Sequence, residues 1–74
     1  MRKGNIEFRW SECNRLHEIV KWQNTTSCYT IAFFRKHEEG YYMETIGERF
    51  FEDHNAWIVA KYGMQFLNAC FNDE

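Results

Sequence analysis

The sequence predicts a small α+β domain in which an antiparallel β-meander of about four strands is followed by one C-terminal helix packed on one face. Two patterns support this fold class. Segments with the alternation or the aromatic and β-branched composition of strands fill the first part of the chain, and one segment of helical periodicity fills the rest. The chain has 74 residues, of which 45% are hydrophobic and 19% aromatic. This balance predicts a single compact, ordered domain spanning residues 1–74.

The first strand is expected in residues 5–10. Ile6, Phe8 and Trp10 alternate there with charged residues. A period of two is typical of a strand with one buried face, so these three side chains are expected to share one side of the sheet.

Residues 11–23 fit two structures. As a helix, the segment would be capped by Ser11 and would carry one apolar face, but Trp22 lies well off that face. As a strand from about Leu16 to Gln23, it would follow a turn at residues 11–14 and end before a run of small polar residues. The strand is the favoured interpretation.

A β-hairpin is expected next. Residues 27–36 and 41–46 are rich in aromatic and β-branched residues. Gly40, in the loop between them, is able to take the positive φ that closes a short connection. Gly47 then ends the second strand of the hairpin.

The remaining segment predicts a helix over residues 53–71. Asp53 is suited to cap it, because a side-chain oxygen at this position accepts from the unpaired backbone N–H groups of the first turn. Gly63 has no side chain and allows the helix to lie close to large aromatic residues of the sheet. At 100° per residue, the buried face is expected to hold Ala56, Val59, Ala60, Gly63, Phe66, Leu67 and Cys70, and the opposite side Lys61, Gln65 and Asn68.

Cysteine usage and hydropathy indicate a cytoplasmic protein. Cys13, Cys28 and Cys70 form an odd set with no CxxC spacing, which does not suit a secreted disulfide framework. The first ten residues are charged and alternating, unlike a signal peptide, and no run of ~18 apolar residues is present. We therefore expect no membrane association.

No residue pattern predicts catalysis, and we expect the protein not to be an enzyme. Cys13 and His17 are four residues apart, but two ligands do not make a metal site, so no metal or other cofactor is expected. Cys70 lies near the end of the predicted helix, where the helix dipole disfavours a reactive thiolate. The acidic pair Glu38–Glu39 occupies a loop tip.

The surplus of aromatic residues indicates a contact surface. Strict alternation would put Tyr29, Ile31 and Phe33 on one face of the hairpin, and apolar residues also occupy the other face, although a single helix covers only one. Tyrosines and long charged stems covering the second face would be a purely structural explanation. Aromatic and Arg residues are enriched in the cores of protein interfaces. The candidate partner-binding residues are Tyr29, Phe33, Arg35, Tyr41 and Tyr42.

We therefore expect a small non-enzymatic protein-interaction module that binds, and by binding inhibits, a larger protein partner. Self-association as a homodimer is a further expectation. The alternative is single-stranded nucleic-acid binding through the aromatic sheet face. It is disfavoured because nine Lys and Arg against eleven Asp and Glu give a net charge of −2. The small size, the absence of proline and the lack of a catalytic motif resemble the general character of phage and mobile-element proteins, many of which block a larger host machine.

Overall fold

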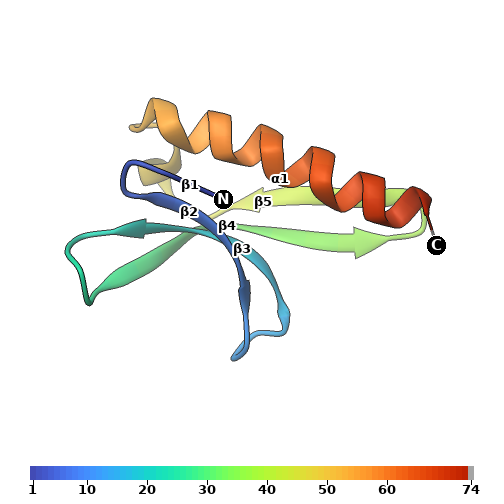
Figure 1. Cartoon of the computed structure of the whole chain (residues 1–74), viewed down its shortest axis with the longest axis horizontal. Coiled ribbons are helices and arrows are strands. Elements are labelled where there is room, and N and C mark those ends of the chain that lie inside the picture. Colours follow the sequence, from blue (N-terminus) through green and yellow to red (C-terminus); the bar gives the residue numbers. More distant parts are fainter. Residues whose placement is uncertain (74) are drawn as a thin grey trace.

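The computed structural model describes residues 1–73 and shows one antiparallel sheet with a long helix lying along one of its faces (Figure 1). The predicted α+β meander with one helix is confirmed, with five strands in place of about four because two N-terminal residues pair with the first predicted strand. Each strand pairs with its neighbour in sequence. The elements are β1 (Arg2–Lys3), β2 (Ile6–Ser11), β3 (Leu16–Trp22), β4 (Cys28–His37), β5 (Gly40–Thr45), a 3-10 turn (Glu48–Phe50) and α1 (His54–Asn72).

The segment that fitted two structures is a strand preceded by a turn. Residues 12–15 form the turn between β2 and β3. Ser11 organises it, because its carbonyl oxygen accepts from Arg15 N at 2.8 Å and its hydroxyl from Asn14 N at 3.2 Å. Arg15 completes the turn with a φ of 56°, a left-handed conformation that is uncommon for residues other than Gly, Asn and Asp. The serine that would cap a helix therefore closes a hairpin instead.

The core lies between α1 and the sheet. The strands contribute large apolar side chains, and α1 meets them with a row of smaller ones. A Cβ atom at Gly63 would lie 2.9 Å from the Phe8 ring and 3.0 Å from the Phe34 ring, so the missing side chain is what allows this close approach. Each large apolar side chain buried here contributes roughly 1.5–3 kcal/mol. The most deeply buried members are Ile6, Ile19, Ile31, Ala32, Phe34, Phe50, Ala56, Val59 and Leu67.

The start of α1 is as predicted. Asp53 is the N-cap, and its Oδ1 accepts from Asn55 N at 2.9 Å. Its second carboxylate oxygen lies 3.8 Å from Lys21 Nζ. The cap therefore also ties the beginning of the helix to β3.

The predicted helix face is correct from Ala56 to Gly63 and again at Leu67, but wrong at three other positions of the last turns. Phe66 and Cys70, expected in the core, are exposed. Asn68, expected in solvent, is half-buried, and its Oδ1 accepts from Tyr41 N of β5 at 3.2 Å. Phe71 also faces β5, with its ring centroid 6.5 Å from that of Tyr41. Because a sheet twists, a straight helix crossing it presents a different side to the strands at each end.

The sheet face turned away from α1, called the open face below, carries a hydrogen-bonded polar layer. The Glu18 side chain lies within it and is only 3% exposed, and it accepts from Arg9 Nε and from Thr30 Oγ1, each at 3.0 Å. Beside it, Trp22 Nε1 donates to Glu7 Oε1 at 3.1 Å. A buried charge is tolerated when it is paired and hydrogen-bonded, so this face is closed by its own side chains.

Basic side chains also lie over the Trp22 and Phe33 rings of the open face. The guanidinium carbons of Arg2 and Arg9 are 5.4 and 5.9 Å from the centroid of the Trp22 ring, and that of Arg35 is 6.0 Å from the Phe33 ring. Contacts of this kind are favourable by roughly 0.5–1 kcal/mol at exposed sites. The open face therefore agrees with the structural explanation, in which charged stems cover its apolar side chains.

Candidate functional site

The structure divides the five predicted contact residues between the two sides of the sheet. Phe33, Arg35 and Tyr42 lie on the open face, where Arg35 and Tyr42 are direct cross-strand partners. Tyr29 and Tyr41 lie on the helix side and pack against the core. The five residues do not form one continuous sheet surface.

A β-bulge in β4 separates Tyr29 from Phe33. The register with β3 shifts within β4, where Ile31 is an extra residue with no partner on β3. Because an inserted residue reverses the alternation of a strand, Tyr29 faces the helix side and Phe33 the open face. The expectation that Tyr29, Ile31 and Phe33 share one face is therefore wrong. On the helix side, the Tyr29 hydroxyl accepts from Arg49 Nη1 at 3.1 Å.

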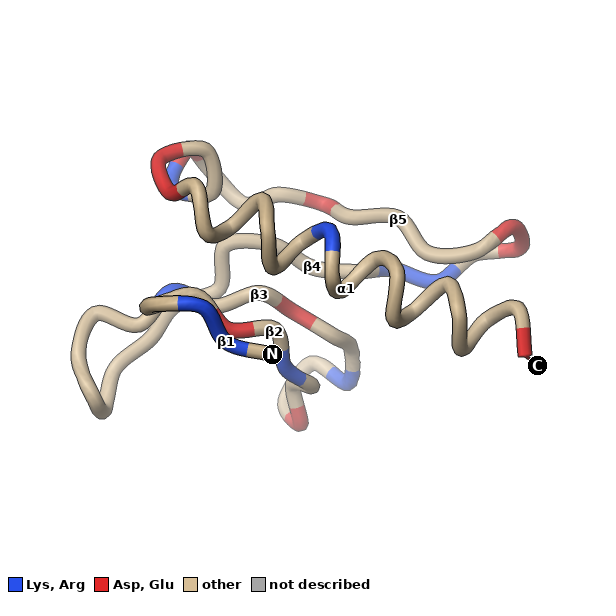
Figure 2. Tube along the Cα trace, turned by 45° about the horizontal axis from the view of Figure 1, so that its top comes forward, with Lys and Arg blue, Asp and Glu red and all other residues tan. Residues whose placement is uncertain are grey.

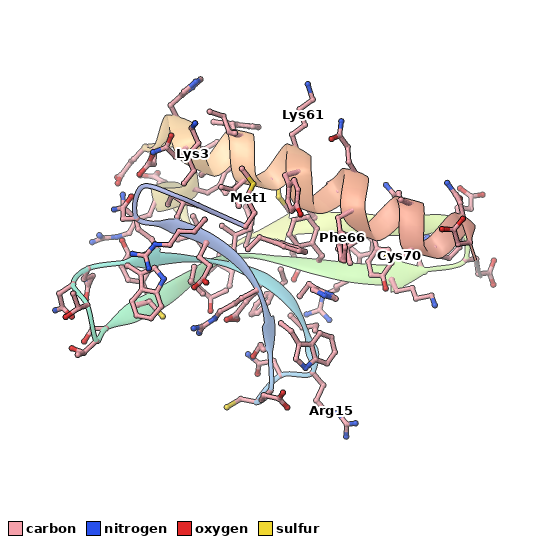
Figure 3. All side chains as sticks on the ribbon, in the orientation of Figure 1. Met1, Lys3, Arg15, Lys61, Phe66 and Cys70 are labelled. Carbon is pink, nitrogen blue, oxygen red and sulfur yellow. The ribbon has the colours of Figure 1, made fainter. Side chains whose placement is uncertain are left out.

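A continuous group of rings, three exposed and one half-buried, lies along one flank of α1. We define the aromatic ridge as Trp10, His17, Tyr62 and Phe66. Its ring centroids are 5.0 Å apart between Trp10 and His17, 6.4 Å between His17 and Phe66, and 6.4 Å between Phe66 and Tyr62. Phe8 lies beneath the ridge, stacked on His17 at 5.2 Å. Trp10, Tyr62 and Phe66 nevertheless remain 47, 43 and 44% exposed, and Figure 3 shows Phe66 projecting from α1 on the side of the strands.

The sequence pattern did not indicate the ridge, for identifiable reasons. Trp10 continues the alternation of the buried β2 residues but is itself exposed near the end of that strand. Phe66 lies at the margin of the apolar arc of α1. Two residues that are four positions apart on a helix lie next to each other on its surface. The Tyr62 and Phe66 rings do stack in this way, with their planes 10° apart. An aromatic pair at this spacing beside the apolar arc is the signal that would have indicated the ridge.

His17 is the titratable member of the ridge. It is half-buried, with its ring parallel to Phe8 within 5° and meeting Trp10 edge-on. Burial lowers the pKa of His17 below its ordinary value, because the imidazolium loses hydration that these rings do not replace. The neutral imidazole is therefore the form that suits the ridge at neutral pH.

This lowered pKa predicts a pH dependence of folding. The unfolded chain binds the His17 proton at its ordinary pKa of about 6.5, above the folded value, so the free energy of unfolding should fall as the pH decreases below about 6.5. His17→Phe removes this contribution but retains an apolar ring. Urea unfolding at about pH 7.5 and about pH 5.5 should show a smaller loss of stability for the variant than for the native protein. An equal loss in both proteins would show that His17 titrates normally.

An open hollow of about 560 Å³ adjoins the ridge at one end of the sheet. β3 pairs with β4 only as far as Phe34, whereas β4 continues along β5 to His37. This stagger leaves room between the β2–β3 turn and the β4–β5 hairpin. The ridge residues Trp10 and His17 line the hollow, together with Arg15, Arg35, Lys36, Tyr41 and Tyr42 among others. Three of the predicted contact residues, Arg35, Tyr41 and Tyr42, therefore meet here.

A second cluster of rings seals the start of α1. Phe50 is fully buried, and the Phe51 and Trp57 rings meet it at 5.4 and 5.0 Å. Phe51 and Trp57 are themselves exposed. This cluster is a cover for Phe50, and it offers an aromatic surface against which the ridge can be tested.

Metal ligands, thiols and membrane spans were also sought in residues 1–73. Within that range no group of three His, Cys, Asp or Glu side chains is close enough to hold a metal ion. Cys13, Cys28 and Cys70 are free thiols. No helix in the described part of the chain has the length and apolar character needed to span a membrane.

Comparison with protein-family models, with curated proteins and with solved structures finds no match to this chain. The case for a function therefore depends on the ridge and the hollow themselves.

Proposed function

We propose that this chain is a small protein-interaction module that acts by occupying a surface on a larger protein partner, with the aromatic ridge as its main contact. The observation that carries the proposal is the continuity of the ridge: rings from β2, β3 and α1 form one exposed surface. Exposed apolar patches of this kind mark interaction sites on soluble proteins. Trp and Tyr are also the side chains that most often contribute strongly to binding.

The polar layer of the open face makes that face a poorer docking surface than the ridge. On the open face, Trp22 and Phe33 lie under guanidinium groups and Glu18 is fully paired. A partner that docked there would have to displace these interactions. Three rings of the ridge, those of His17, Tyr62 and Phe66, already have one side against Phe8, and Trp10 meets the His17 ring. Covering the outer sides of the ridge removes apolar area at a gain of roughly 25 cal/mol per Å².

A rigid module of this size that binds through one surface works by competition. Whatever uses the same surface of the partner is excluded while the module is bound. This is the mode of action of small phage-type inhibitors, and we extend it to this chain as part of the proposal. Pairing of two ridges in a homodimer is the competing arrangement.

Substitution of the ridge tests the proposal. Trp10→Ser and Tyr62→Ser should each weaken capture of the partner by about 30-fold or more, since loss of an aromatic anchor costs roughly 2 kcal/mol or more. Each should leave the free energy of unfolding within about 1 kcal/mol, because both side chains are nearly half exposed. The measurement is pull-down from a lysate of the encoding organism with mass spectrometry, followed by titration of the captured protein.

Trp57→Ser is the matched control, because it removes an exposed ring from the second cluster at the start of α1. It should leave capture unchanged. Loss of capture with Trp57→Ser and retention with Trp10→Ser would contradict the assignment to the ridge. Sedimentation equilibrium decides the competing arrangement: a dimer that Trp10→Ser dissociates would mean that the ridge binds a second copy of the chain.

A further inference from the structure

The hollow beside the ridge combines rings with positive charge. Arg15, Arg35 and Lys36 contribute cationic groups, and Tyr41 and Tyr42 contribute rings. None of the described residues that line it is acidic. In a chain whose net charge is −2, this grouping of three basic side chains is a property of the site and not of the whole protein.

Two of the basic groups are available to a ligand. Arg15 projects outward from the β2–β3 turn at the rim (Figure 3), and its guanidinium makes no hydrogen bond or ion pair within the described residues. Arg35 Nε lies 3.4 Å from Glu44 Oε2, and both side chains are about half exposed. An exposed pair of this kind is worth about 0–1 kcal/mol, and a guanidinium has five N–H donors. Arg35 therefore retains donors for a second carboxylate.

We propose that the hollow takes an acidic peptide segment of the protein partner, with carboxylates on Arg15 and Arg35 and one apolar side chain against Trp10 and Tyr42. This inference rests on the proposed function and specifies the chemistry of the partner. A volume of about 560 Å³ is within the range of sites that enclose a small group with a few placed polar contacts. The ridge then covers the part of the partner's surface that flanks this acidic segment.

The charges around the hollow favour a short acidic peptide over a nucleic acid. Glu38 and Glu39 form the tip of the β4–β5 loop, directly after the basic residues of β4 (Figure 2). Glu12 lies in the turn on the opposite side. A strand of single-stranded DNA or RNA continues in both directions and would bring its phosphates against these carboxylates, whereas a peptide places its few charges only at the basic groups.

Peptide selection tests the inference without assuming the partner. A random twelve-residue library displayed on phage is selected on the native protein and counter-selected on the R15E/R35E variant. The recovered sequences should be enriched in Asp and Glu and should contain an aromatic or large apolar residue. Recovery of sequences without acidic enrichment, or of none that prefer the native protein, would overturn the inference.

Binding of the consensus peptide then locates the contact. Arg35→Glu should weaken it at least about tenfold, since truncated or reversed charge pairs at interfaces have effects of this size or larger. Glu44→Gln releases Arg35 from its present pair and should leave binding equal or tighter. In NMR spectra the peptide should shift the indole N–H of Trp10 and leave that of Trp57 in place.

Three results would overturn the inference. Weaker binding with Glu44→Gln would mean that Arg35 acts through its pair with Glu44. Shifts confined to Trp57 would place the peptide elsewhere, and tighter binding of a thymidine oligonucleotide would make nucleic acid the ligand. Partner capture that Trp10→Ser abolishes but Arg35→Glu leaves intact would support the proposed function and contradict only this inference.

Discussion

Phe34→Ala is expected to unfold most of the protein at 25 °C, whereas Phe33→Ala leaves it folded. Phe34 is 1% exposed and packs edge-on against Phe8 within the core. Removing a ring from such a site costs about 3–5 kcal/mol, which is about the whole net stability of a domain of this size. Phe33 is half-buried on the open face, so the loss of its ring should cost only about 1 kcal/mol.

The two substitutions form a matched pair, because they remove the same ring from adjacent positions of β4. Circular dichroism and urea unfolding measure the difference directly. Equal losses for the two variants would show that the open face is as closely packed as the face covered by α1. A larger loss for Phe33→Ala would mean that Phe33, and not Phe34, faces α1.

The second large effect concerns the carboxylate of Glu18. Arg9→Met retains the apolar stem but leaves Glu18, which is 3% exposed at its side chain, with Thr30 alone as partner. Removing one partner of a buried ion pair costs about 3–5 kcal/mol. The Arg9 side chain is 39% exposed, so water reaches the site and we expect a loss of about 2 kcal/mol.

The reverse substitution should be much milder, and this asymmetry is the measurable result. Glu18→Leu leaves Arg9 with a solvated charge and fills the buried site with apolar atoms. The double variant Arg9→Met/Glu18→Leu should unfold at a urea concentration above that of Arg9→Met alone, because buried ion pairs are often replaceable by apolar groups without loss. If the double variant is the least stable of the three, the ion pair itself holds the two strands together.

Secondary structure could be predicted from the sequence because it depends on local signals. Each signal acts within a few residues: the alternation around Ile6 and Phe8 indicates a strand, Gly40 a tight connection and Asp53 the start of the helix. Even in the ambiguous segment of residues 11–23, which contains β3, one local fact favoured the strand: the position of Trp22. The helix of residues 53–71 is found as α1, His54–Asn72.

The candidate site could be predicted only in part, because it depends on relations between elements. One inserted residue, Ile31, moves Tyr29 to the side opposite Phe33, and nothing in the local composition indicates it. The ridge requires β2, β3 and α1 to meet at a particular angle. Arg35, Tyr41 and Tyr42 were identified as contact residues for their types, yet the hollow that brings them together results from the unequal lengths of β3 and β4.

The order of the strands has a consequence for biosynthesis. Since every strand pairs with its neighbour in sequence, the sheet requires only short loop closures and can assemble rapidly while translation continues. The helix that covers Phe8 and Phe34 is made after all five strands. During synthesis of α1, the strands that have already left the ribosome therefore expose aromatic side chains that the helix covers only later, and chaperone engagement or aggregation on polysomes would be concentrated at that stage. Slowing translation within the α1 codons should lengthen the exposure and lower the soluble yield.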